Sequence, residues 1–306
     1  MKKVLVATVK PFDPAAIPQI KAVVENAGYK LELVEKYADQ SDLVKAVEDA
    51  DALIIRSDKV TEEVVNAAKK LKIVVRAGAG YDNVDTKACS ANGVVAMNTP
   101  GQNSNAVAEL AIGMMVFQAR GQFNGKSGTE LSGKKLGIHA FGNVGRLVAK
   151  IAKGFGMEVY AFDPFVNKED VEKEGVIACD TMEELYSTCQ YISLHIPAND
   201  KTKKSIGLDI LNRMPANAVL VNTARKEVIH EEELIKLMAE KTDFTYISDI
   251  APDCKEEIAE KFDGRYFFTP KKSGAQTKEA NVNAGVAAAN QIIAYFESGD
   301  ETFKVN

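Results

Sequence analysis

Two glycines at a predicted strand-to-helix turn are the strongest sign of chemistry in this 306-residue chain. The turn lies in Leu136–Gly145, where an apolar run gives way to a helical pattern, and Ala140 stands where the first glycine of a dinucleotide-binding loop usually lies. In such loops, backbone N–H groups and the positive end of the helix hold a pyrophosphate. The residues predicted to contact a dinucleotide are Gly142, Asn143, Val144 and Gly145.

Asp163 indicates which dinucleotide binds. After the turn, apolar residues at helical spacing lead to a second apolar run, Glu158–Phe162, which ends at this acid. A carboxylate about 20 residues beyond such a loop binds a ribose 2′-hydroxyl. Its charge would repel the 2′-phosphate of NADP, so the sequence predicts NAD. The alternative is an ordinary β-α-β turn that uses glycine only for tight packing.

Ala140 makes this loop unusual. Its Cβ requires that the turn keep a negative φ or bear steric strain. We therefore expect weaker NAD binding than a loop with glycine at this position would give.

The rest of the sequence predicts the strands and helices that would position the glycine loop and Asp163. Short apolar runs alternate with helical patterns almost throughout, which is typical of doubly wound α/β units. The predicted strands are Val4–Ala7, Leu31–Val34, Ala52–Ile55, Ile73–Val75, Val94–Met97, Glu158–Phe162, Tyr191–Leu194, Ala218–Val221, Thr245–Ser248 and Tyr266–Phe268. The main predicted helices are Ile17–Asn26, Asp42–Glu48, Glu62–Lys70, Asp85–Asn92, Asn103–Ala119 and Asn281–Phe296. The chain thus divides into two α/β units with a seam near Asn98–Gly101.

Composition argues against several other classes of protein. The net charge is −5 and no basic stripe appears, so we expect no nucleic-acid partner. No apolar stretch approaches the length of a membrane span, so we expect no membrane partner. The four cysteines are scattered and form no C-x-x-C pair, which favours free thiols in the cytoplasm. We predict no metal site.

Four polar segments, taken with the glycine loop, resemble the D-isomer-specific 2-hydroxyacid dehydrogenases in order and over almost the whole chain. The segments are Arg76–Asp85, Asn98–Ser104, Ser193–Pro197 and Val221–Arg225. The resemblance is strongest to members that act on D-3-phosphoglycerate without a regulatory domain. It implies NAD-dependent oxidation of D-3-phosphoglycerate to 3-phosphohydroxypyruvate, for serine synthesis.

The resemblance also implies the architecture. It predicts an α/β protein of two doubly wound parallel-sheet domains around a cleft. A flavodoxin-like substrate domain would comprise residues 1–98 plus 282–306, and a Rossmann NAD domain residues 99–281. Members of the family pair through the cofactor domain, so a homodimer is expected.

Two other functions stay open at this stage. The chain could be a dehydrogenase for another D-2-hydroxy acid, such as glycerate or glyoxylate. It could also be an NAD-sensing binding protein that has lost turnover.

The resemblance assigns roles to individual residues. Arg225 matches the arginine that holds the substrate carboxylate and 2-oxo group, because a guanidinium supplies a fixed bidentate cation. The residues expected to bind the rest of the substrate are Arg56, Ser57, Arg76, Ala77, Gly78 and Asn103. The further residues expected to line the cofactor are His195, Pro197, Thr223, Ala224, Asp249 and Gly274.

Lysine replaces the histidine that normally acts as the family's acid/base. The segment after the last predicted strand begins Thr269-Pro270-Lys271-Lys272. Counting from Pro270 selects Lys271, whereas counting back from Gly274 selects Lys272. We favour Lys271 because it directly extends the strand. The alternative is that both are solvated loop charges.

The glutamate that normally accompanies the histidine is also missing. Cys254 stands at its position, with Asp253, Glu256 and Glu257 nearby. A close carboxylate would raise the pKa of a lysine further above its ordinary value of about 10.4. We therefore expect no carboxylate to pair closely with the catalytic lysine, and we expect Cys254 to be a structural thiol rather than a nucleophile.

Overall fold

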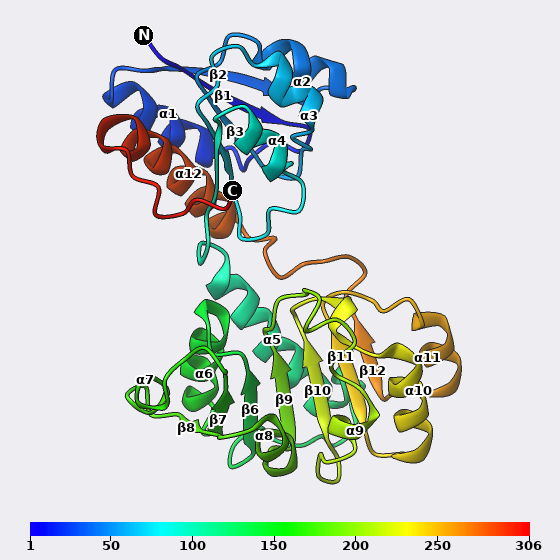
Figure 1. The fold of residues 1–306 in the computed structure, drawn as a ribbon. Helices are drawn as coiled ribbons and strands as arrows, with labels where there is room; N and C mark the ends of the chain where they lie inside the picture. The colour runs from blue at the N-terminus through cyan, green and yellow to red at the C-terminus, as the bar shows by residue number, and fades with distance from the viewer. The chain divides into compact units, whose positions relative to one another are not determined.

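The computed structural model describes residues 1–306 and separates them into two compact units (Figure 1). The first unit comprises Met1–Asn103 and Gln276–Asn306. The second comprises Ser104–Ala275. Each unit is a parallel sheet covered by helices, so the predicted α/β class is confirmed. No helix combines the length and apolar character that crossing a lipid bilayer requires.

The first unit is built on five parallel strands in the order β2-β1-β3-β4-β5. The strands are β1 Lys3–Thr8, β2 Lys30–Glu35, β3 Ala52–Ile55, β4 Ile73–Arg76 and β5 Val95–Asn98. Successive side chains of β1 point to opposite faces, so Val4 and Val6 enter one core whereas Leu5 and Ala7 enter another. This explains why the strand is apolar along its length.

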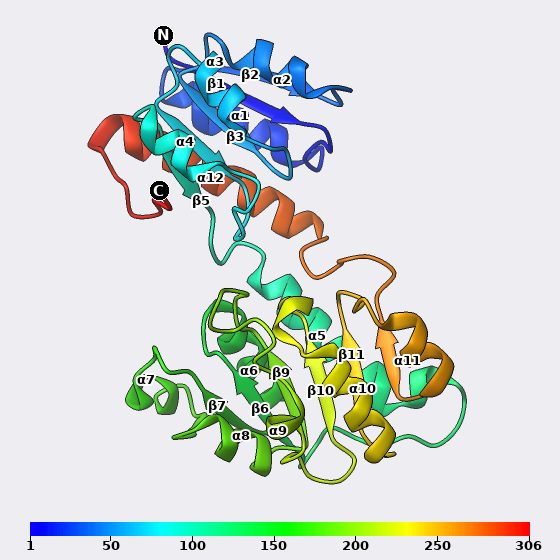
Figure 2. The same cartoon turned by 45° about the vertical axis from the view of Figure 1, so that its right-hand side comes forward.

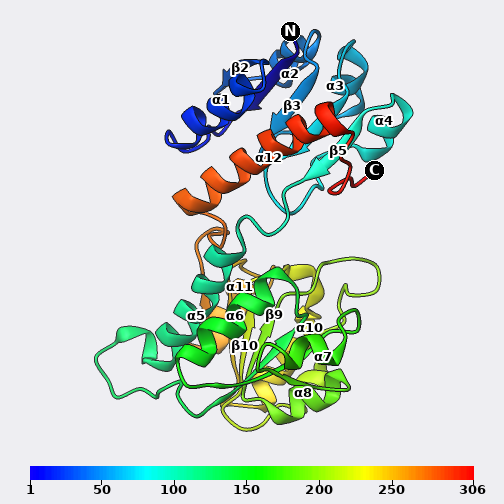
Figure 3. The same cartoon turned by 90° about the vertical axis from the view of Figure 1, so that its left-hand side faces the viewer.

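Helices cover both faces of this sheet. α1 and α12 lie side by side on one face (Figure 3), and α2, α3 and α4 cover the other (Figure 2). Their bounds are α1 Ala16–Asn26, α2 Gln40–Val47, α3 Glu62–Ala67, α4 Thr86–Ala91 and α12 Lys278–Ser298. α12 packs through small residues such as Ala284 and Ala288, which lets it lie close to α1.

The second unit is built on seven parallel strands in the order β12-β11-β10-β9-β6-β7-β8. The strands are β6 Lys135–His139, β7 Glu158–Phe162, β8 Ile177–Ala178, β9 Tyr191–Leu194, β10 Val219–Asn222, β11 Thr245–Ser248 and β12 Tyr266–Phe268. α5 and α6 pack over one core of this unit, and α8 and α10 pack over the other. The helices and turns are α5 Ser104–Ala119, η1 Gly121–Phe123, α6 Asn143–Gly154, α7 Lys168–Glu172, α8 Met182–Thr188, α9 Leu208–Leu211, η2 Lys226–Val228, α10 Glu231–Glu240 and α11 Lys255–Lys261.

The strand order reverses at one point in each sheet. In the first unit the reversal lies between β1 and β3, and in the second it lies between β6 and β9. Ligands of open α/β sheets bind outside the carboxyl ends of the strands at such points. We therefore expect ligands to bind beside the residues that follow these strands.

Candidate active site

The nucleotide loop joins β6 to α6 at the reversal point of the second unit. Gly142 has extended backbone and is the N-cap of α6, a helix of 12 residues. A Cβ on Gly145 would lie 2.4 Å from the Ala140 carbonyl oxygen, so glycine is needed for the helix to begin this close to the strand. The first turn of α6, with Asn143 and Val144, can thus present its N–H groups to a pyrophosphate.

Asp163, which was predicted to bind the ribose of the dinucleotide, is hydrogen-bonded to the nucleotide loop. Its Oδ2 accepts a hydrogen bond from Phe141 N–H at 2.8 Å, and its Oδ1 accepts from Phe165 N–H at 2.9 Å. Each carboxylate oxygen has a second lone pair. The side chain can therefore accept from a ribose hydroxyl while it holds the loop.

Two conformations were expected for Ala140, one with a negative φ and one that is strained, and the structure has the strained one. Its φ is +79°, in the left-handed region that glycine adopts freely. This costs a residue with a Cβ about 1–2 kcal/mol. Ala140 N–H donates to Phe162 O at 2.9 Å, which helps to hold the turn in place.

His195 lies just after β9, across the reversal point from the loop, and Pro197 follows it. Its Nε2 is 2.9 Å from Ser193 Oγ and its Nδ1 is 3.5 Å from Thr223 Oγ1. Burial lowers the pKa of His195 to about 3. The ring is therefore neutral near pH 7 and is a poor acid/base, which suits a lining role.

The other two histidines, His139 and His230, are not among the residues predicted to line the cofactor. His139 is a buried core residue, as predicted, with Nδ1 3.1 Å from the Tyr186 hydroxyl. Burial lowers the pKa of His139 to about 4. His230 is the N-cap of α10.

Arg225 follows β10 in a turn that is organised by Asn222. The buried Asn222 amide donates to Arg225 O at 3.0 Å and accepts from Ala224 N–H at 3.0 Å. An Arg225 Nη1–H donates to Ala224 O at 2.9 Å. Asn222 was not among the predicted site residues, although a polar residue at the end of a buried strand was a usable signal.

The lysine segment follows β12 and is attached to Asp249. Lys271 and Lys272 are both exposed, whereas Gly274 is buried. Asp249 is buried, and its carboxylate accepts from Ser273 N–H at 2.7 Å and from Gly274 N–H at 2.8 Å. Asp249 therefore binds the lysine segment itself.

The carboxylates near the missing glutamate have other partners. Asp253 lies 2.5 Å from Lys226 Nζ, Glu256 lies 3.5 Å from Lys255 Nζ, and Glu257 lies 2.7 Å from Lys261 Nζ. Each of these acids is thus already engaged by a different lysine.

Cys254 is not poised for nucleophilic chemistry. Burial and the nearby Glu231 carboxylate raise the pKa of this thiol to about 12. Glu231 also accepts hydrogen bonds from the Asp253 and Cys254 N–H groups at 3.0 and 2.9 Å, which fixes the backbone there. These contacts agree with a structural thiol.

The first unit brings two predicted arginines together at the ends of neighbouring strands. Arg56 Nη1 donates to Lys10 O at 3.0 Å and to Pro11 O at 2.6 Å. Arg76 Nε donates to Arg56 O at 3.0 Å. Gly78 has φ +150°, and a Cβ there would lie 1.4 Å from Arg76 Nη1, so only glycine leaves room for this guanidinium.

The backbone N–H groups of Ala77 and Gly78, two of the predicted substrate residues, are used within the unit. Ala77 N–H donates to Ile55 O and Gly78 N–H donates to Arg76 O, each at 2.8 Å. Asn98 Nδ2 donates to Ala79 O at 2.6 Å and so orients the next peptide. Of the predicted substrate residues, Ser57 is exposed and Asn103 is half-buried just before α5.

Asp58 is a buried acid near the ends of β1 and β3, where the strand order reverses. It was not among the predicted site residues. Its Oδ1 accepts from Val9 N–H and from the Tyr37 hydroxyl, both at 2.7 Å. Burial and this carboxylate raise the pKa of Tyr37. Asp58 thus joins the ends of β1 and β3 beside Arg56.

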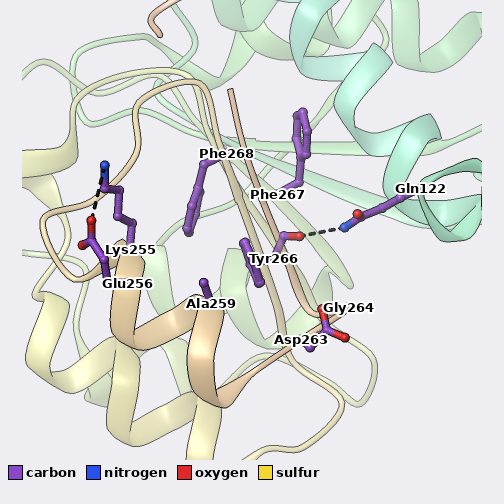
Figure 4. Close-up of a pocket in the computed structure, with 9 residues that line it drawn as sticks. All are labelled: Gln122, Lys255, Glu256, Ala259, Asp263, Gly264, Tyr266, Phe267 and Phe268. Atoms are coloured by element: carbon purple, nitrogen blue, oxygen red, sulfur yellow. Dashed lines mark hydrogen bonds and ion pairs between the residues drawn. The ribbon is translucent and has the colours of Figure 1, made fainter. Parts of the chain in front are cut away.

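A cavity of about 460 Å³ lies elsewhere on the second unit, along the edge strand β12 (Figure 4). Tyr266 and Phe268 line it together with Ala259 of α11, and Gln122 Nε2 donates to Tyr266 O at 2.7 Å across it. It contains none of the residues predicted to bind substrate or cofactor.

Comparison with known proteins identifies the family. The model of the D-isomer specific 2-hydroxyacid dehydrogenase NAD-binding domain matches residues 106–261. The chain is 46% identical to a solved structure of NAD⁺-bound 3-phosphoglycerate dehydrogenase in Entamoeba histolytica, with a TM-score of 0.88. The two chains are covered over 100% and 98% of their lengths.

Curated relatives differ in length and in name. D-3-phosphoglycerate dehydrogenase of Methanocaldococcus jannaschii is 37% identical over 83% of this chain and 51% of its own length. Hydroxypyruvate reductase of Thermotoga maritima is 33% identical over 86% of this chain and 90% of its own length. The chain spans about half the length of the Methanocaldococcus jannaschii relative and of the curated D-3-phosphoglycerate dehydrogenases of Synechocystis and Rattus norvegicus.

Proposed function

The chain belongs to the D-isomer specific 2-hydroxyacid dehydrogenases, and we propose that it oxidises D-3-phosphoglycerate to 3-phosphohydroxypyruvate with NAD. The observation that carries this proposal is that Arg56 and Arg76 lie at the ends of neighbouring strands of the first unit, where Arg76 Nε donates to the Arg56 backbone oxygen. Two guanidinium groups offer the charge that a phosphate needs. The relatives named D-3-phosphoglycerate dehydrogenase support the same substrate.

NAD fits the loop of the second unit. Gly142 borders open space at the start of α6, where a pyrophosphate would lie, and Gly145 lets the helix begin close to β6. Asp163 offers oxygens to a ribose. When bound, NAD accepts the hydride from the substrate C2 carbon. His195, Pro197, Thr223, Ala224 and Gly274 would line the cofactor.

Arg225 and one lysine would act on the substrate itself. Arg225 would hold the carboxylate and the C2 oxygen of the substrate. The neutral form of Lys271 or Lys272 would take the hydroxyl proton as hydride leaves.

Two broader properties belong to the proposal. We expect a homodimer formed through the cofactor unit. The 66% exposed Phe123 of that unit supports this expectation, because covering an apolar side chain is favourable. We also expect the protein to act in the cytoplasm, because its four cysteines are free thiols.

A second candidate is reduction of an unphosphorylated 2-oxo acid. The hydroxypyruvate reductase of Thermotoga maritima favours it, because that relative matches along 90% of its length. An enzyme for hydroxypyruvate or glycerate would make little use of a phosphate site.

Steady-state kinetics with D-3-phosphoglycerate and with D-glycerate separate these functions. Arg56→Ala should raise the KM for D-3-phosphoglycerate at least tenfold, because a charge-assisted contact to phosphate is worth roughly 1.5–3 kcal/mol. Lys87→Ala, which removes an exposed charge of the same unit, is the control. An unchanged KM in Arg56→Ala, with better turnover of D-glycerate, would favour the second candidate.

The same assay identifies the acid/base lysine. Lys271→Ala and Lys272→Ala should differ, with one losing roughly 10²–10⁴-fold in kcat, the usual range for a lost general base. If neither variant loses activity, both lysines are solvated loop charges. If the unaltered chain binds NAD but reduces none with any 2-hydroxy acid, it is a binding protein.

A further inference from the structure

The carboxylate of Asp58 joins the carboxyl ends of three strands of the first unit. Its Oδ1 accepts hydrogen bonds from Val9 N–H, just after β1, and from the Tyr37 hydroxyl, shortly after β2, both at 2.7 Å. Its Oδ2 accepts from Arg56 N–H, just after β3, at 3.3 Å. β2, β1 and β3 are neighbours in the sheet, so one side chain fixes the place where the strand order reverses.

These three hydrogen bonds require an acid at position 58. A carboxylate offers two acceptor oxygens, whereas an amide offers one and would turn its NH₂ group toward one of the donors. Asp58 is only 6% exposed, so a donor that lost this partner would stay buried without one. The turn that begins with Arg56 therefore depends on the carboxylate of Asp58.

The peptide of Arg56 is supported from a second side. Arg56 O accepts hydrogen bonds from Arg76 Nε at 3.0 Å and from Asn83 Nδ2 at 3.2 Å. Asn83 Nδ2 also donates to Asp58 O at 2.6 Å. Both backbone polar groups of Arg56 thus have partners, which fixes the point from which its side chain extends.

The guanidinium of Arg56 is held by the segment that follows β1. Its Nη1 donates to Lys10 O at 3.0 Å and to Pro11 O at 2.6 Å, and its central carbon lies 5.2 Å from the centre of the Phe12 ring. Lys10 and Pro11 directly follow Val9 in the chain. Both hydrogen bonds use Nη1, so Nε and Nη2 keep their N–H groups for a ligand.

Asp58 consequently holds Arg56 at both ends. It binds the backbone from which the side chain extends, and through Val9 N–H it binds the segment that the guanidinium contacts. A phosphate gains more from a guanidinium that is already held in place, because less side-chain freedom is lost on binding.

We propose that Asp58 is a positioning residue that makes the protein prefer a phosphorylated over an unphosphorylated 2-hydroxy acid. It acts through Arg56 and does not itself contact the substrate. This inference rests on the proposed function, because the phosphate of D-3-phosphoglycerate is the group that Arg56 would bind.

Steady-state kinetics at saturating NAD test this role. Asp58→Asn should raise the KM for D-3-phosphoglycerate roughly tenfold, which corresponds to about 1.4 kcal/mol. It should change kcat less than about twofold, because the phosphate is bound equally in the ground state and the transition state. Glu63→Gln, an exposed acid of α3 in the same unit, is the matched control and should leave both constants unchanged. An unchanged KM, or a kcat that falls tenfold, would overturn the proposal.

A double-mutant cycle asks whether Asp58 works through the arginine. In the background of Arg56→Ala, Asp58→Asn should raise the KM no further, because residues that act as one unit are not additive. A full additional tenfold rise would contradict the proposal. If Asp58→Asn does not fold, Tyr37→Phe removes one donor and keeps the carboxylate. That variant should raise the KM about threefold, and an unchanged KM would count against the proposal.

Amide hydrogen exchange separates this inference from the proposed function. The Val9 and Arg56 amides should exchange slowly in the unaltered protein and faster in Asp58→Asn or Tyr37→Phe, whatever the substrate. Fast exchange of both amides in the unaltered protein would overturn the role of Asp58. Slow exchange without turnover of D-3-phosphoglycerate would instead contradict only the proposed function.

Discussion

At the scale of single residues, Ala140 is where this chain departs most clearly from what its backbone favours. A φ of +79° strains a residue that carries a Cβ, so removing the methyl group should relieve that strain. The same methyl group belongs to a side chain that packs against one core of the second unit. Ala140→Gly should raise the free energy of unfolding by about 0.5–1 kcal/mol, since glycine's extra freedom in the unfolded chain offsets part of the gain. Urea denaturation measures this change.

The same variant tests the effect on the cofactor. If the strained loop weakens NAD binding, Ala140→Gly should lower the Kd in isothermal titration calorimetry. An unchanged or higher Kd would mean that the strain has no bearing on binding. Val144→Ala, in the first turn of α6, is a suitable comparison because its backbone is helical.

His139 makes the stability of the protein depend on pH. Its folded-state pKa lies at about 4, below the ordinary 6.5, because burial disfavours the charged ring. Between pH 4 and 6.5 the unfolded chain therefore binds more protons than the folded protein. The contribution of His139 to the free energy of unfolding is complete above about pH 6.5 and is lost as the pH falls toward 4. We expect the melting temperature to drop over that interval, and to drop less in His139→Gln. Tyr186→Phe, which keeps the titrating ring, should drop like the unaltered protein; equal slopes in all three would contradict this assignment.

At the scale of elements, the alternation of apolar runs predicted most strands accurately. β3, β7, β9, β11 and β12 begin and end where the pattern placed them. β8 was missed because a two-residue edge strand carries no periodicity.

The polar residues at the strand ends were predicted less completely. The segments themselves were found, but the roles of Asn222 and Asp58 were not, because each depends on hydrogen bonds to chain segments that only the fold brings near. The conformation of Ala140 was likewise left open, since both signs of φ are compatible with the same residues.

The end of the chain protects an edge strand of the first unit. Val305 N–H donates to Ala96 O at 2.9 Å, and Asn306 Oδ1 accepts from Ala96 N–H at 2.8 Å. Removing residues 304–306 should cost about 1–3 kcal/mol, the sum of two or three net hydrogen bonds. The exposed β5 edge should also promote self-association. Urea denaturation and light scattering measure both effects.

Lys304→Ala is the control for this truncation. It removes only an exposed ion pair with Glu301 and leaves the backbone pairing of the tail in place. A truncated protein that is as stable and as monodisperse as Lys304→Ala would show that β5 needs no cover.

At the scale of the whole molecule, the two units differ in how the chain builds them. The first is assembled from two separate segments, whereas the second is one continuous stretch, Ser104–Ala275. The contacts described for the nucleotide loop, for Asp163 and for the lysine segment all come from within that stretch. The second unit also has two cores of its own and holds the residues proposed to bind the cofactor.

We therefore expect residues 104–275, produced alone, to unfold cooperatively and to bind NAD with a Kd within about threefold of the whole chain. They should not turn over D-3-phosphoglycerate, because Arg56 and Arg76 lie in the other unit. Circular dichroism and isothermal titration calorimetry provide the measurements, and Asp163→Ala in the excised unit should weaken binding if NAD occupies the loop. A fragment that folds but binds no NAD would mean that the first unit contributes to the cofactor site, and the division of labour proposed for the two units would then be wrong.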